Sequence, residues 1–255
     1  MDWIIGGTKD SRDFAEKLKT LGVNMKEIVI STVSEYGKKL AENLGTEIHT
    51  GAMNETEMEK FAVGNKIVRI FDFSHPYAVE VSKNAMNISR KLNIEYFRFE
   101  RELLNYKKSF DFSDIDLLVK FLENLGTDKG NILVTLGSNN IEKFKNLKNL
   151  DKIYFRILPV KESIEKLENA GIKAKNILGM QGPFSKEFNK AVYENYKIKY
   201  VVTKESGATG GESEKIEAAY ETGAVPVVLK RPKINYSWVS SDINKTAEEF
   251  IKGLK

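Results

Sequence analysis

The stretch MDWIIGGTKDSRDFAEKLKTL, residues 1–21, joins a short apolar run, two glycines and an amphipathic pattern. The run at residues 3–5 is typical of a buried strand, and the apolar spacing over residues 10–21 predicts a helix. Between them, Gly6-Gly7-Thr8 forms the turn that ends the strand and begins the helix. Apolar runs and amphipathic stretches alternate in this way along the chain, which predicts an α/β protein with parallel sheets and right-handed crossovers.

The same patterns place the remaining elements. We expect the other strands at residues 27–31, 47–50, 67–73, 96–99, 132–136, 153–158, 176–180, 200–203 and 225–229. We expect the other helices at residues 36–44, 77–92, 115–125, 161–170, 186–196, 212–222 and 241–254.

Ten strands suit either one wide sheet or two halves of five. The turn-rich segment 126–130 favours a division there, which predicts an N-terminal α/β domain over residues 1–126 and a C-terminal one over residues 127–255. The last helix, at residues 241–254, follows a long connection and is a candidate to pack back on the first domain.

Composition excludes several classes of protein. With no cysteine and only two histidines, we expect no disulfide, thiolate site or histidine metal cluster. The sequence has no long apolar run and no secretory signal at its start, so we expect a cytoplasmic protein without membrane contacts. The net charge of +4 is spread over 33 lysines and 7 arginines without a block of like charges, which argues against nucleic-acid binding.

Glycine and hydroxyl residues follow several predicted strands, where open α/β sheets bind ligands. Gly6-Gly7-Thr8 opens a helix whose free N–H groups can bind a phosphate, and the glycines before residue 212 repeat the pattern. Hydroxyls end the second strand where NAD-preferring domains place an acid, which favours NADPH. The alternative is that these residues only form turns. The candidate cofactor-binding residues are Gly6, Gly7, Thr8, Ser31, Thr32, Ser206, Gly207, Gly210 and Gly211.

Four of the seven arginines also follow predicted strands, namely Arg98, Arg101, Arg156 and Arg231. Guanidinium groups bind carboxylates through paired hydrogen bonds, so two such sheet edges facing each other would form a cleft for a polyanionic substrate. The alternative is ion pairing inside the protein, for instance with Glu100 and Glu102.

Two other titratable residues lie at predicted strand ends. We expect His75 and Lys204 to face the ligand because both emerge from a buried sheet at its ligand-binding edge. The alternative for His75 is a structural role, which is the usual role of a lone histidine. By contrast, Lys166, Lys190 and Lys215 lie within predicted helices, so we expect their charges to be solvated.

An ordered set of motifs resembles one known family. The motifs are Gly6-Gly7-Thr8, Asp72-Phe73-Ser74-His75-Pro76-Tyr77-Ala78, Arg98-Phe99-Glu100-Arg101, Arg156-Ile157-Leu158-Pro159, Gln181-Gly182-Pro183-Phe184, Lys204-Glu205-Ser206-Gly207 with Gly210-Gly211, and Arg231-Pro232. Together they resemble the precorrin-6A reductase family of cobalamin biosynthesis over about residues 6–232. Two positions depart from the family pattern: Phe73 replaces a more common Ala, and Glu102 replaces the usual Pro.

The resemblance implies two Rossmann- or flavodoxin-like halves and an oxidoreductase. Such an enzyme reduces one double bond of (cobalt-)precorrin-6A to give (cobalt-)precorrin-6B, with hydride from NADPH or NADH. Any cobalt belongs to the polycarboxylate substrate, so we expect no protein-bound metal, and a monomer or small homo-oligomer. The implied substrate-binding residues are Arg98, Arg101, Arg156, Gln181, Gly182, Pro183, Phe184, Lys230 and Arg231, and the candidate proton donors are His75, Lys204 and Tyr77.

Two alternatives to the reductase remain open. Two facing Rossmann-like halves also build nucleotide-sugar transferases. A non-catalytic module that binds a nucleotide or a tetrapyrrole would need the same loops without the chemistry.

Overall fold

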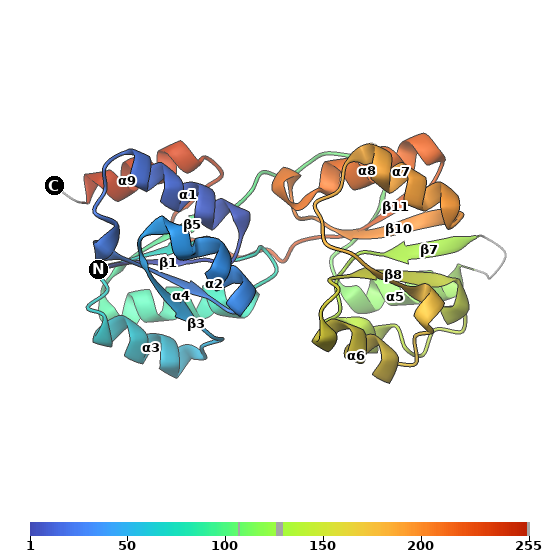
Figure 1. Cartoon of the computed structure of the whole chain (residues 1–255), viewed down its shortest axis with the longest axis horizontal. Helices are drawn as coiled ribbons and strands as arrows, with labels where there is room; N and C mark the ends of the chain where they lie inside the picture. Colours follow the sequence, from blue (N-terminus) through green and yellow to red (C-terminus); the bar gives the residue numbers. More distant parts are fainter. Residues whose placement is uncertain (107, 126–129, 254–255) are drawn as a thin grey trace. The chain divides into compact units, whose positions relative to one another are not determined.

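The computed structural model describes residues 1–106, 108–125 and 130–253, and Figure 1 shows its helices and strands. The chain divides into two compact units. Unit 1 contains Met1–Glu102 and Pro232–Lys255, and unit 2 contains Leu103–Arg231. Each unit has its own parallel sheet flanked by helices, which confirms the predicted α/β class.

Within the described residues, unit 1 forms a six-stranded parallel sheet of order β3-β2-β1-β4-β5-β12. This is the dinucleotide-binding order 3-2-1-4-5-6, with its sixth strand supplied after the chain returns from unit 2. The strands are β1 (Asp2–Ile5), β2 (Ile28–Thr32), β3 (Glu47–Thr50), β4 (Arg69–Asp72), β5 (Glu95–Phe99) and β12 (Val239–Ser240). The helices are α1 (Lys9–Thr20), α2 (Glu35–Ala41), α3 (Glu55–Gly64), α4 (Val79–Leu92) and α9 (Ile243–Lys252).

Alternating side chains of the central strands bury both faces of this sheet. Ile4 and Phe71 point to one face, where they pack with Phe14 of α1 and Phe250 of α9. Trp3, Ile5 and Val29 point to the other face, where they pack against α3 and α4. Figure 1 shows α9 beside α1 although the two helices lie at opposite ends of the sequence.

Unit 2 repeats the strand order of unit 1. Its described residues form a six-stranded parallel sheet of order β9-β8-β7-β10-β11-β6. Here the strand in the sixth position precedes the other five in the sequence. The strands are β6 (Phe110–Phe112), β7 (Asn131–Val134), β8 (Ile153–Ile157), β9 (Ile177–Gly179), β10 (Ile198–Lys204) and β11 (Val225–Leu229), and the helices are α5 (Ile115–Asn124), α6 (Lys161–Asn169), α7 (Lys186–Asn195) and α8 (Glu212–Thr222).

One connection distinguishes unit 2 from unit 1. Residues 135–152, which join β7 to β8, are all described and contain two short 3₁₀ turns but no α-helix. In unit 1 the corresponding connection, from β1 to β2, contains α1. Helices α7 and α8 cover one face of the unit 2 sheet, and α5 and α6 lie on the other (Figure 1).

The structure differs from the sequence-based expectations in several elements. The expected domain boundary between residues 126 and 127 lies outside the described residues, but α5 and β6 before it already belong to unit 2, which begins at Leu103. By contrast, the last helix, α9, packs on unit 1, as expected. Strands β6 and β12 and helix α3 were not predicted, because two or three residues give no strand pattern and α3 is only weakly amphipathic.

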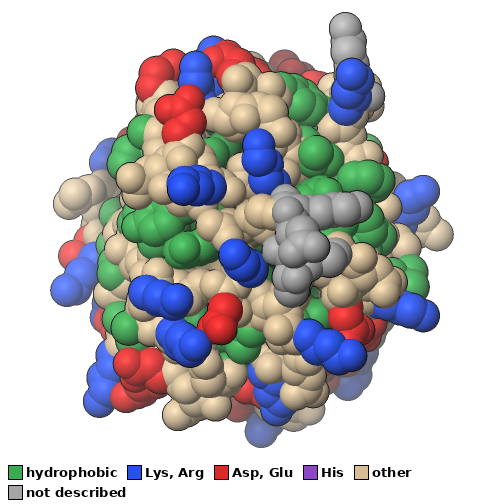
Figure 2. All heavy atoms as spheres, turned by 90° about the vertical axis from the view of Figure 1, so that its right-hand side faces the viewer, with side chains coloured by type: hydrophobic (Ala, Val, Ile, Leu, Met, Phe, Trp, Pro, Cys, Tyr) green, Lys and Arg blue, Asp and Glu red, His purple; other side chains and the backbone are tan. Residues whose placement is uncertain are grey.

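Charged side chains of both signs lie on one face of unit 2. Figure 2 shows Lys and Arg side chains interspersed with Asp and Glu side chains on one face of unit 2. Among the described residues, no helix is long and apolar enough to cross a membrane. These residues also contain no cluster of three or more His, Cys, Asp or Glu side chains placed to hold a metal ion.

Candidate active site

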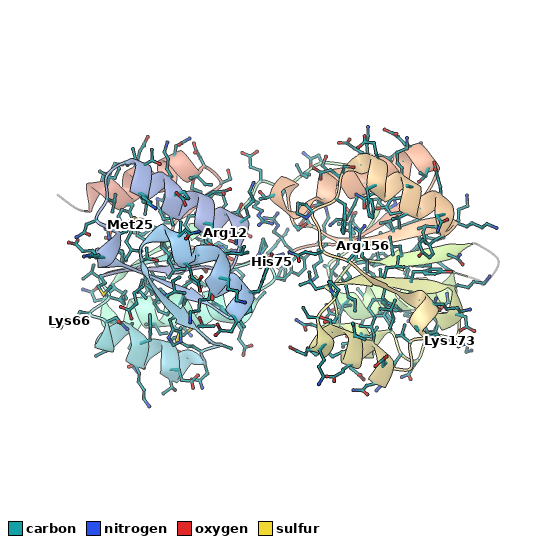
Figure 3. All side chains as sticks on the ribbon, in the orientation of Figure 1. Arg12, Met25, Lys66, His75, Arg156 and Lys173 are labelled. Atoms are coloured by element: carbon teal, nitrogen blue, oxygen red, sulfur yellow. The ribbon has the colours of Figure 1, made fainter. Side chains whose placement is uncertain are left out.

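The first candidate pocket lies at the carboxyl ends of β1 to β4 in unit 1 and has a volume of about 260 Å³. Figure 3 shows His75 at this end of the unit, away from Met25 and Lys66. No Lys, Arg, Asp or Glu lines the pocket in the described part of the chain. The loop residues that line it are Gly6, Gly7, Thr8, Ser31, Thr32, Val33, Ser34, Gly51, Ala52, Met53, Ser74, His75 and Ala78.

The glycine turn after β1 brings the backbone close to this pocket. The Gly6 N–H donates to the Ser31 carbonyl at 2.8 Å, and a Cβ at Gly6 would lie 2.9 Å from Ile30 Cγ2. Gly7 has φ +89°, in the left-handed region that favours glycine. Within the described residues, the N–H groups of Gly7 and Lys9 donate to no protein acceptor. The beginning of α1 therefore has N–H groups available for an anion.

Thr8 fixes this turn to the neighbouring loop. Its hydroxyl accepts the Ser11 N–H at 3.2 Å as the N-cap of α1. The same hydroxyl donates to the Phe73 carbonyl at 2.9 Å, in the loop that leads to His75. Thr8 thus has a structural role at the edge of the pocket.

A buried ion pair supports the loop that carries His75. Arg98 Nη1 donates to Asp72 Oδ1 at 2.9 Å and to Ser74 Oγ at 3.0 Å. Asp72 also accepts hydrogen bonds from the hydroxyls of Ser82 and Tyr96, both at 2.6 Å. Burial by itself would raise the pKa of Asp72, but Arg98 and these hydrogen bonds hold that pKa below its ordinary value.

His75 and Tyr77 lie in a tight turn that directly follows Ser74 of this network. The Tyr77 N–H donates to His75 Nδ1 at 3.3 Å, and the His75 carbonyl accepts the Ala78 N–H at 2.7 Å. The two side-chain rings lie 5.7 Å apart between centroids. Helix α4 begins at Val79, so the expected start of this helix at residue 77 is wrong by two residues.

The second candidate pocket lies at the carboxyl ends of β7 to β10 in unit 2, the same position in the sheet as the first. Its volume is also about 260 Å³. Arg156 and Lys215 line it, and in the described part of the chain no acid does. The other lining residues are Thr135, Gly137, Ile157, Leu158, Met180, Gly182, Pro183, Phe184, Asn189, Thr209, Gly210 and Gly211. Figure 3 shows Arg156 at one end of the unit, away from Lys173.

The glycine loop after β10 is closed by a carboxylate of its own helix. Glu212 is fully buried in the first turn of α8, and its Oε2 accepts the Gly207 N–H at 2.6 Å. Burial raises the pKa of Glu212, although the Gly207 and Ser206 N–H groups oppose the shift. This loop follows β10, which occupies the place of β4 in unit 1, so it does not repeat the position of Gly6-Gly7 in the sheet.

Three of the four strand-end arginines form ion pairs with buried acids. Arg98 pairs with Asp72, Arg101 pairs with Asp10 at 2.6 Å, and Arg231 lies 3.8 Å from Glu205. Arg98 has no exposed surface, so the expectation that it contacts substrate is wrong. The expected alternative of internal ion pairing therefore applies. Arg98 also lies 3.5 Å from Glu100, as that alternative expected, whereas Asp72, Asp10 and Glu205 are distant in the sequence from the arginines they pair with.

The remaining predicted residues take varied positions. Lys230 pairs with Glu205 at 2.8 Å and with Asp111 at 3.0 Å. Gln181, Gly182 and Pro183 are exposed in the loop after β9. Lys204 is partly buried at the end of β10, and burial lowers its pKa.

Sequence analysis missed two residues of the unit 2 pocket. Lys215 lines the pocket, so the expectation that its charge is solvated is wrong. Asn189 is buried and accepts a hydrogen bond from Arg156 Nη1 at 2.7 Å. The only sequence signal for Lys215 was its position one turn after the glycine loop.

A further cavity lies elsewhere in unit 2. It has a volume of about 700 Å³ and is lined by Tyr220 of α8 and by Val225 and Pro226. These last two residues begin β11, so this cavity lies away from the carboxyl ends of the strands. We place the candidate site at the two smaller pockets, because ligands of such sheets bind at the carboxyl ends.

Comparison with known proteins identifies a family. The family model described as "Precorrin-6x reductase CbiJ/CobK" matches residues 3–253. A cobalt-precorrin-6A reductase of Methanococcus maripaludis is 33% identical over 92% of each chain, and one of Methanocaldococcus jannaschii is 32% identical over 99% of this chain and 98% of the relative. The solved structure of CobK precorrin-6A reductase matches 99% of this chain and 97% of its own with a TM-score of 0.79 at 17% identity, so it has the same fold. The chain belongs to the precorrin-6x reductase family CbiJ/CobK.

Proposed function

We propose that the protein reduces one double bond of cobalt-precorrin-6A with NADPH, giving cobalt-precorrin-6B in cobalamin biosynthesis. The observation that carries this proposal is the family match over nearly the whole chain, because family membership makes the chain an oxidoreductase. The names of the two archaeal relatives, both above 30% identity, support the cobalt-loaded substrate. The transferase and the non-catalytic module have no comparable support.

Unit 1 is the proposed binding site for the dinucleotide. Its strand order, its glycine turn after the central strand and its open helix N-terminus are the three features that hold a pyrophosphate in such sheets. Gly6 and Gly7 allow the backbone to approach the phosphates, and Thr8 orients the turn. The uncharged pocket beside them suits the nicotinamide and ribose groups.

Unit 2 has the same strand order and a glycine with positive φ, Gly137, after its central strand, but it lacks the helix N-terminus at that position. No α-helix follows its central strand β7, so no helix N-terminus faces a ligand there. The glycine loop after β10 has a carboxylate of its own, because Glu212 accepts the Gly207 N–H. A phosphate at that loop would have to displace a buried negative charge. Ser206, Gly207, Gly210 and Gly211 are therefore not part of the proposed cofactor site.

The end of β2 favours NADPH over NADH. Ser31 and Thr32 end that strand, and no acid lines the described pocket beside them to bind the ribose hydroxyls of NADH. Arg12 lies one turn into α1, where its Nη1 donates to the Thr8 carbonyl at 3.1 Å, and it forms no ion pair with any described acid. Its charge is available to a phosphate group near this turn.

When bound, the nicotinamide supplies a hydride, and one proton must complete the reduction. His75 is the best-placed candidate proton donor, because it lines the proposed cofactor pocket and the Asp72–Arg98 network holds its loop. Tyr77 and Lys204 remain candidates for the same role. We also propose a monomeric or small oligomeric state and a cytoplasmic location.

An anaerobic reduction assay tests the function. We expect the purified protein to oxidise NADPH only when cobalt-precorrin-6A is present, and to oxidise NADH more slowly. Absorbance of the nicotinamide and of the macrocycle would follow both reactants. If the protein left cobalt-precorrin-6A and metal-free precorrin-6A unreduced with both nucleotides, the proposed function would be wrong.

A further inference from the structure

Two cations share the unit 2 pocket without an acidic partner. Arg156 has only 7% of its surface exposed, and its guanidinium lies 4.8 Å from the centre of the Phe184 ring. The Lys215 ammonium donates to the Gly210 carbonyl at 3.2 Å and to Thr203 Oγ1 at 3.4 Å. Neither cation lies within ion-pair distance of any described carboxylate. Each therefore has only neutral hydrogen-bond partners.

This arrangement is unfavourable in the free protein. Removing two like charges from water without an ion-pair partner costs free energy, and their mutual repulsion adds to that cost. Burial, with Arg156 and Lys204 as further causes, lowers the pKa of Lys215 to about 8, although Glu212 and Glu214 on the same helix oppose the shift. Groups that are shifted in this way inside a pocket are candidates for ligand binding.

We propose that Arg156 and Lys215 together bind one carboxylate of the macrocyclic substrate. This inference rests on the proposed function, because the precorrin macrocycle carries several acetate and propionate arms. Asn189 holds the guanidinium in place through its hydrogen bond to Nη1, so the fork faces the pocket in a fixed orientation. Asn189 is thus a positioning residue.

The volume of the pocket limits the size of the group that it can enclose. A volume of about 260 Å³ is below the roughly 300–1,000 Å³ of pockets that enclose whole drug-sized ligands. It suits one acid arm of the substrate rather than the macrocycle. Met180, Pro183 and Phe184 supply apolar walls for the methylene groups of such an arm.

The geometry favours a carboxylate over a phosphate. Phosphate sites in such folds are built from backbone N–H groups at a helix N-terminus. Here the glycine loop directs the Gly210 carbonyl oxygen at Lys215, and Glu212 already uses the Gly207 N–H. A fixed guanidinium fork matches the two oxygens of a carboxylate, and the Lys215 ammonium adds a second positive charge without any backbone N–H group.

Steady-state kinetics of the full-length protein test this inference separately from the function. We expect Arg156→Met and Lys215→Met each to raise the KM for cobalt-precorrin-6A about 10- to 100-fold while the KM for NADPH stays unchanged. The double variant should lose less than the product of the two single effects, because both cations bind one carboxylate. Arg156→Lys should retain part of the affinity, and it keeps the test usable if Arg156→Met does not fold.

Lys190→Met is the matched control. Lys190 follows Asn189 on α7 but pairs with Glu221 on the surface, so its removal should leave both KM values unchanged.

The wild-type KM for the macrocycle should rise above about pH 8, where Lys215 loses its proton, and this rise should be absent in Lys215→Met.

Glutarate and inorganic phosphate distinguish the two kinds of anion. Glutarate should compete with the macrocycle in the wild type and lose this effect in Arg156→Met. If both single variants reduced the macrocycle with an unchanged KM, the inference would fail while the proposed function stood. The second outcome concerns phosphate. If phosphate competed with NADPH in the wild type but not in Arg156→Met, the pocket would belong to the dinucleotide, and the inference would also be overturned.

Discussion

The two units have the same strand order and a pocket of about 260 Å³ at the same edge of the sheet, but the pockets differ in charge. The unit 1 pocket has no charged side chain in its described lining, and the unit 2 pocket has Arg156 and Lys215. Unit 1 also has an open helix N-terminus after its central strand, whereas unit 2 has two 3₁₀ turns there.

This difference suits the two pockets to two unlike ligands. Backbone N–H groups and glycines bind phosphates without any charged side chain, and the surrounding apolar surface then accepts the planar rings of a dinucleotide. A carboxylate on a flexible arm needs cations instead. The fold supplies the position of both pockets, and a few side chains and one helix decide what each binds.

The largest expected effect concerns two arginines at strand ends. Arg98→Met would leave Asp72 as an unpaired buried charge, so we expect a loss of about 3–5 kcal/mol in the free energy of unfolding of unit 1. Arg156→Met breaks no ion pair with a described acid and should cost about 1 kcal/mol or less.

Urea unfolding measures both effects. Trp3 and Trp238 both lie in unit 1, so tryptophan fluorescence follows that unit, and circular dichroism follows the whole chain. Equal losses of stability in the two variants would contradict the distinction between a structural arginine and a ligand-binding one.

A second comparison uses one glycine from each pocket. A methyl group at Gly6 would clash with Ile30, so Gly6→Ala should displace the turn and weaken NADPH binding by at least about tenfold. Gly137 has φ +78° after the central strand of unit 2, so Gly137→Ala should cost about 1 kcal/mol of stability without changing NADPH affinity.

Calorimetric titration with NADPH measures both affinities, with the macrocycle KM as the control. A larger loss of NADPH affinity in Gly137→Ala than in Gly6→Ala would place the dinucleotide in unit 2.

Sequence patterns predicted the α/β class and most central elements because buried parallel strands are continuously apolar. They missed β6 and β12 because strands of three and two residues are recognisable only beside their partners, β11 and β5. For the same reason the sequence predicted the domain boundary too late in the chain. The pairing of β6 with β11 is what shows that residues 110–112 belong to unit 2.

The candidate site was harder to predict than the fold. An arginine at a strand end looks the same in sequence whether it binds a ligand or a buried acid. The acid that pairs with Arg101 is Asp10, 91 residues away, and no local pattern connects the two. Lys215 shows the opposite error: its helical position suggested a solvated charge, but it lines the unit 2 pocket and its ammonium donates to the Gly210 carbonyl, where burial lowers its pKa.

The smallest expected effect concerns Glu212, whose carboxylate closes the glycine loop of unit 2. Glu212→Ala removes the acceptor of the Gly207 N–H and should cost about 1 kcal/mol of stability, whereas Glu212→Gln keeps an oxygen at that place. Burial raises the pKa of Glu212 in the folded state, so the ionised wild-type carboxyl lowers the free energy of unfolding at pH values above that pKa. This destabilisation fades as the pH falls toward the pKa of the unfolded chain. The stability of Glu212→Gln relative to the wild type should therefore increase as the pH rises from about 4.5. Urea unfolding of both variants between pH 4 and pH 8, about the range over which a carboxyl titrates, measures this difference. A relative stability that did not change with pH would mean that Glu212 is not the buried anion that distinguishes the loop of unit 2 from the open turn of unit 1.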